Sequence, residues 1–77
     1  MIRLCDLQTG KRARVNRIYG DDYRLSELGF TKGAETVPLF HAPYFTKKEN
    51  AMRAYLIRTA VIGLRTEDAM RIEVEEL

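Results

Sequence analysis

Runs in which apolar and polar side chains alternate recur along the chain, and a period of two is typical of half-buried β-strands. The runs predict strands at residues 11–18, 35–41, 51–58, 60–64 and 71–75. The alternation slips between Val15 and Ile18, which predicts a bulge or a sharp bend in the first strand. Short strands separated by glycine turns predict a mostly β fold, a small closed or half-closed barrel.

Two of these strands carry further positional information. Pro38 has no N–H to donate to a β-ladder, so the strand at 35–41 is predicted to lie on a sheet edge at that point. The run Ala60–Leu64 is apolar and rich in β-formers, which predicts a central strand.

One short helix is predicted between the first two strands, at Tyr23–Leu28. Leu25 and Leu28 lie three residues apart and so share one helical face. Gly29 follows the last apolar position, where a left-handed glycine commonly ends a helix, and Phe30 can then fold back over the helix end. A second helical turn is predicted from Thr66, before the last strand.

The chain has 77 residues, which predicts a single domain over residues 1–77. A domain this small leaves little apolar surface for a walled active-site cleft, which needs roughly 300 Å³ or more. The chain also lacks a glycine-rich phosphate loop that ends in Lys-Ser or Lys-Thr. We therefore predict a binding module that is not an enzyme and has no catalytic residues.

Metal-ligating residues are sparse. Cys5 and His41 are the only cysteine and histidine, and the paired acids are adjacent in sequence, as in solvated turns and tails. No constellation of converging ligands is visible, so we predict neither a metal site nor a cofactor. A lone thiol suits a reducing compartment.

The charge balance, 13 basic against 11 acidic residues, gives a net charge of +2. This balance is too even to indicate a polyanion partner by itself. Arg12, Arg14 and Arg17, together with the aromatic and basic residues at 44–48, keep a nucleic-acid-binding module open as an alternative. No targeting peptide and no run of about 20 apolar residues is present, so we expect a cytoplasmic protein.

Four segments in order resemble the FeoA family (ferrous iron transport protein A). They are Leu4–Lys11 at the start, Arg24–Glu35 in the centre, the pair Ala42-Pro43, and the closing segment Ile62–Val74. The chain departs from the family pattern in two places, at Tyr44–Asn50 and near Thr59, where a glycine is usual.

The resemblance implies an SH3-like barrel and an accessory role in ferrous iron uptake. The implied partner is a membrane ferrous iron transporter with a G-protein-like cytosolic domain, and any membrane association would run through that partner. An SH3-like regulatory domain unrelated to transport is the remaining alternative, and the oligomeric state stays open.

For the contact with that partner we predict residues on the helix and in the loop after the second strand. These are Tyr23, Arg24, Leu25, Phe30, Tyr44 and Phe45. Aromatic side chains and arginines are the residue types that most often anchor interfaces. Leu25, Leu28 and Phe30 also have a second interpretation, as core residues that pack the helix onto the barrel.

Overall fold

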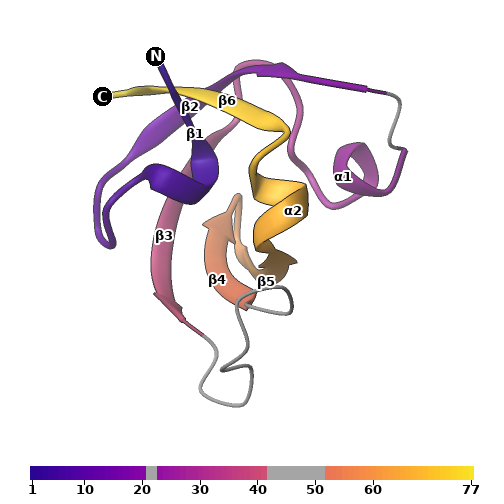
Figure 1. The fold of residues 1–77 in the computed structure, drawn as a ribbon. Helices are drawn as coiled ribbons and strands as arrows, with labels where there is room; N and C mark the ends of the chain where they lie inside the picture. Colours follow the sequence, from indigo (N-terminus) through magenta and orange to yellow (C-terminus); the bar gives the residue numbers. More distant parts are fainter. Residues whose placement is uncertain (21–22, 42–51) are drawn as a thin grey trace.

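The computed structural model describes residues 1–20, 23–41 and 52–77 (Figure 1). The elements, in chain order, are β1 (Ile2–Arg3), the 3-10 turn η1 (Leu4–Asp6), β2 (Ala13–Ile18), α1 (Tyr23–Glu27), β3 (Glu35–His41), β4 (Met52–Ile57), β5 (Ala60–Arg65), α2 (Thr66–Ala69) and β6 (Ile72–Glu76). The five predicted strands, the helix between the first two of them and the helical turn before the last are therefore confirmed.

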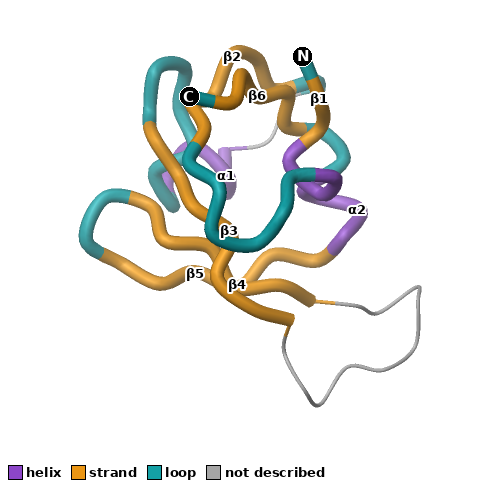
Figure 2. The backbone as a smooth tube through the Cα atoms, turned by 90° about the vertical axis from the view of Figure 1, so that its left-hand side faces the viewer, coloured by secondary structure: helices purple, strands orange, loops and turns teal. Residues whose placement is uncertain are grey.

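Within the described ranges all strands join one antiparallel sheet in the order β1-β6-β2-β3-β4-β5. Figure 2 shows how the sheet curls, with β1, β6 and β2 at one end, β4 and β5 at the other, and β3 running between them. β5 is the last strand of this order, so the prediction that Ala60–Leu64 is central was wrong. Its apolar run does not reflect burial on both faces, because Val61 is 58% exposed.

The irregularities predicted along the strands have clear structural counterparts. The register between β2 and β6 shifts between Val15 and Arg17, which confirms the bulge. The edge predicted at Pro38 is confirmed at that point, where β3 pairs only with β4, although β3 as a whole is an interior strand of the sheet. The ladder from β3 to β2 nevertheless ends at Thr36, and Pro38 accepts a 2.8 Å hydrogen bond from the Gly10 N–H. Proline is tolerated because it lies beyond that ladder.

The core fills the inside of the curled sheet. Its fully buried apolar side chains come from nearly every element, and they include Leu4, Leu7, Val15, Leu25, Phe30, Tyr55, Ile57, Ile72 and Val74. η1 contributes Leu4 and Leu7, which its single turn brings to one side. Since α1 shares this one small core with β2, β4, β5 and β6, its position depends on the same packing as the sheet.

Candidate partner-binding surface

The end of α1 is fixed by a backbone motif with two characteristic hydrogen bonds. Gly29 has a φ of 109°, its N–H donates to the Ser26 carbonyl at 3.0 Å, and the Phe30 N–H donates to the Leu25 carbonyl at 3.0 Å. This pairing is the Schellman motif, in which a left-handed glycine lets the chain reverse and satisfies the last helical carbonyls. The helix stop predicted at Gly29 is confirmed.

The side chains of Leu25 and Phe30, the two residues joined by this motif, are both part of the hydrophobic core. Both side chains have 0% exposure, and the Phe30 ring meets the Tyr55 ring edge to face, with centroids 6.4 Å apart. Neither side chain reaches the surface, so the prediction that Leu25 and Phe30 contact a partner was wrong. They hold α1 on the barrel, as their core interpretation expected.

Tyr23 and Arg24 are the predicted contact residues that α1 does present to solvent. The Tyr23 side chain is 85% exposed. Arg24 Nη2 donates to Asp68 Oδ2 at 2.9 Å, and the Asp68 side chain is only 13% exposed. This ion pair ties α1 to α2 and directs the Arg24 side chain toward Asp68. Tyr44 and Phe45, the other two predicted contacts, lie outside the described residues.

The ion pair of Arg24 and Asp68 lines a small depression with a volume of about 190 Å³, which we call the α1–α2 depression. Its lining includes Arg24, Leu28, Met52, Leu64 and Asp68. The sequence analysis did not find Asp68, because the acid lies 44 residues after Arg24 and only the fold brings the two side chains together.

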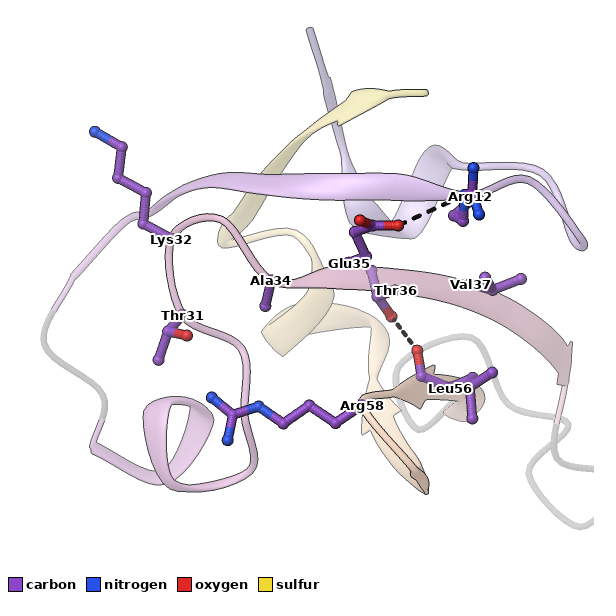
Figure 3. Close-up of a pocket in the computed structure, with 9 residues that line it drawn as sticks. All are labelled: Arg12, Thr31, Lys32, Ala34, Glu35, Thr36, Val37, Leu56 and Arg58. Carbon is purple, nitrogen blue, oxygen red and sulfur yellow. Dashed lines mark hydrogen bonds and ion pairs between the residues drawn. The ribbon is translucent and has the colours of Figure 1, made fainter.

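A larger open groove, which we call the β3–β4 groove, lies on the outer side of these two strands and has a volume of about 470 Å³ (Figure 3). Arg12, Lys32 and Arg58 line it together with the apolar side chains of Val37 and Leu56. The sequence analysis missed this groove. The available signal was Leu56, which alternates with the buried Tyr55 and Ile57 and must therefore point away from the core.

Cys5 and Arg53 each have a reactive or charged side chain that is partly or fully buried. Burial, together with the neighbouring Asp6 carboxylate, raises the pKa of the Cys5 thiol above its ordinary value. Arg53 is buried and donates from Nη2 to Thr9 Oγ1 at 3.0 Å, and its Nε has no partner among the described residues. Among the described residues, no three His, Cys, Asp or Glu side chains come together in a way that could hold a metal ion.

Nothing in the described helices is both long enough and apolar enough to cross a membrane.

A family model described as the FeoA domain matches residues 2–76 of the chain. Among curated proteins, no sequence matches the chain significantly.

Solved structures share the fold over nearly the whole chain. The FeoA protein from Chlorobium tepidum is 25% identical, with a TM-score of 0.81, and the match covers 99% of this chain and 70% of that one. The iron(II) transport protein A from Clostridium thermocellum is 28% identical, with a TM-score of 0.84, and the match covers 99% of this chain and 46% of that one.

The description of a third solved structure states its fold class. The Stenotrophomonas maltophilia FeoA complexed with zinc, described as an SH3 domain protein, is 23% identical, with a TM-score of 0.76 over 97% of this chain and 91% of that one. The SH3-like architecture expected from the sequence is therefore confirmed.

Proposed function

This chain belongs to the FeoA family, which is linked to ferrous iron transport, and on that premise we propose that it is an accessory protein of ferrous iron uptake. In this proposal the protein is cytosolic and binds the G-protein-like cytosolic domain of a membrane Fe(II) transporter, and the contact supports transport. The observation that carries the proposal is the family match, which spans residues 2–76.

The names of related proteins support the same role. The Clostridium thermocellum protein is called an iron(II) transport protein A. The Stenotrophomonas maltophilia FeoA is described as a protein proposed to act as a ferrous iron transport activating factor. Both descriptions concern those proteins, and we extend the role to this chain as a hypothesis.

The surface of α1 supplies a physical basis for the contact. An exposed aromatic side chain, Tyr23, lies next to Arg24, and both residue types are enriched among the side chains that contribute most to interfaces. The glycine motif at one end of α1 and the bond from Arg24 to Asp68 hold the helix in place. A surface that is already ordered loses less conformational entropy when a partner binds.

Co-purification with the isolated cytosolic domain of the transporter, together with a ferrous iron uptake assay in cells, tests this proposal. We expect the wild-type chain to co-purify and Tyr23→Ala to weaken the complex about tenfold, as an aromatic anchor would. Leu77→Ala is the control, since it also removes an exposed apolar side chain, but one that follows β6 and does not belong to α1.

Two outcomes would contradict the proposal. The proposed function is wrong if the wild-type chain does not bind the cytosolic domain and deletion of its gene leaves ferrous iron uptake unchanged. If binding survives Tyr23→Ala unchanged, the function stands and the assignment of α1 as the contact is wrong.

A further inference from the structure

The β3–β4 groove carries an excess of positive charge that the described part of the fold does not neutralise. Among the described residues that line it, Glu35 is the one carboxylate, and it is already approached by Arg12 at 3.6 Å and by Arg14 at 3.8 Å. Neither Lys32 nor Arg58 forms a hydrogen bond or an ion pair with any described residue. Two cations that line the groove, Lys32 and Arg58, therefore have no described counter-charge.

Apolar side chains form the floor next to these cations. Val37 in β3 pairs with Leu56 in β4, and Leu56 pairs in turn with Val61 in β5. The three residues thus form a row across the outer face of the sheet, where Leu56 is 36% exposed and Val61 is 58% exposed. An apolar row of this kind beside charged groups is a common feature of protein-binding surfaces.

Arg58, which lines the groove, has an unfavourable backbone conformation. It lies in the two-residue turn between β4 and β5 and has a φ of 56°, the only positive φ among the described residues other than glycine. Its side chain runs back along the cap of α1, since a Cβ placed on Gly29 would lie 3.6 Å from Arg58 Nε (Figure 3). Backbone strain of this kind concentrates at functional positions.

We propose that the β3–β4 groove binds a short acidic and apolar segment of a partner protein. Carboxylates of that segment pair with Lys32 and Arg58, and its apolar side chains pack on the row of Val37, Leu56 and Val61. This binding goes beyond the proposed accessory role, because it concerns a different surface and does not require the transporter to be the partner.

Two other occupants fit the groove less well. A nucleic acid would place phosphates near Glu35 and gain nothing from the apolar row, which offers no aromatic face for base stacking. A second copy of the chain would need its own acidic and apolar segment, Glu75–Leu77. That segment is already engaged, since β6 pairs with β2 and the Leu77 N–H donates to the Arg12 carbonyl at 2.9 Å.

Fluorescence anisotropy with synthetic peptides tests the proposal on the full chain. The probe is a labelled ten-residue peptide of alternating Glu and Leu, and the matched probe has Lys in place of Glu. We expect the Glu peptide to bind and to lose about tenfold in affinity between about 50 and 500 mM NaCl, because salt screens exposed charges. We expect the Lys peptide not to bind.

Variants separate the groove from the rest of the surface. Lys32→Glu and Arg58→Gly should each weaken binding of the Glu peptide about fivefold or more, the effect of losing one charge pair near a surface. Arg58→Gly should at the same time raise the melting temperature, so its loss of binding cannot come from a damaged fold. Arg17→Ala is the control, because it removes an exposed cation that does not line the groove.

The proposal is overturned if both groove variants bind the Glu peptide like the wild type, or if a single-stranded oligonucleotide binds more tightly than the peptide. It is also overturned if sedimentation shows that the chain self-associates and Lys32→Glu abolishes the association. None of these results bears on co-purification with the transporter, so failure here leaves the proposed function intact.

Discussion

Gly29 at the end of α1 and Arg58 in the β4–β5 turn both have a positive φ, but Gly29 has no side chain and Arg58 has a long, charged one. Gly29 has a φ of 109° and Arg58 a φ of 56°, and they lie against each other. At Gly29 the residue suits the conformation, and at Arg58 it does not, at a cost of about 1–2 kcal/mol. The cap of α1 thus follows the requirements of folding, whereas the turn keeps a cation that the fold itself does not need.

The largest expected effect concerns the cap, where Phe30→Ala removes a ring with 0% exposure. We expect a loss of about 3–5 kcal/mol in the free energy of unfolding, the usual range for deleting a buried aromatic side chain. Urea denaturation followed by circular dichroism measures it. Tyr23→Ala is the matched control and should change stability by less than about 0.5 kcal/mol, because its side chain is exposed. Equal effects of the two variants would show that Phe30 does not anchor the cap.

The next effect tests the glycine itself. Gly29→Ala forces a side chain onto a φ of 109° and places its Cβ 3.3 Å from Ile57 Cγ1. We expect a loss of about 1–3 kcal/mol by the same measurement. Gly33→Ala, at a φ of 92° with no atom within 4 Å of the new Cβ, has the strain without the contact and should lose less. A smaller loss at Gly29 than at Gly33 would contradict the close packing described here.

The third effect has the opposite sign. Arg58→Gly relieves the left-handed conformation, and we expect a gain of about 1 kcal/mol in the free energy of unfolding. Arg58→Ala removes the same cation but keeps a Cβ, so it should give no such gain. If Arg58→Gly lowers the stability, the side chain of Arg58 stabilises the fold and the contrast with Gly29 does not hold.

The smallest effect concerns pH, and it belongs to neither region. The Glu73 carboxylate accepts hydrogen bonds from Asn16 Nδ2 at 2.9 Å and from the Tyr19 hydroxyl at 2.8 Å, which lowers its pKa below the ordinary value. The stability gained from this shift is present above the pKa of the unfolded chain, and it is lost as the pH falls through the lower pKa of the folded state. Glu73→Gln should therefore flatten the decline of stability on acidification between about pH 5 and pH 3.

The matching control is Arg58→Gly, whose gain arises in the backbone and should be the same at both ends of that range. Urea midpoints across the range measure both variants. An unchanged acid profile for Glu73→Gln would show that the two hydrogen bonds do not favour the charged form.

Much of the fold was predictable because alternation and turn residues are local. The strand at 35–41 agrees at both ends with β3, and Gly29 ends the helix as expected. β1 was missed, since a strand of two residues is too short to show a period. The position of β5 was mistaken because an apolar run records residue types, while burial depends on which strands lie on either side.

The candidate surfaces were less predictable, for a physical reason. The spacing of Leu25 and Leu28 shows that the two share a helical face, but it does not show how completely the core covers that face. The β3–β4 groove draws on separate segments, among them Arg12, Lys32 and Leu56, which become neighbours only when the strand register is set. Tyr23 and Arg24 could be placed together on α1 from the sequence because they are adjacent in it, and their contact with a partner stays a prediction.

The strand order has a consequence for the synthesis of the chain on the ribosome. β6, at Ile72–Glu76, lies between β1 and β2 and pairs with both, although those two strands are made first. The early strands therefore leave the ribosome without their shared neighbour, and the meander of β3, β4 and β5 can form before them. The sheet closes only when β6 emerges, so β1 and β2 are among the last strands to be protected from proteases and from pairing with other nascent chains.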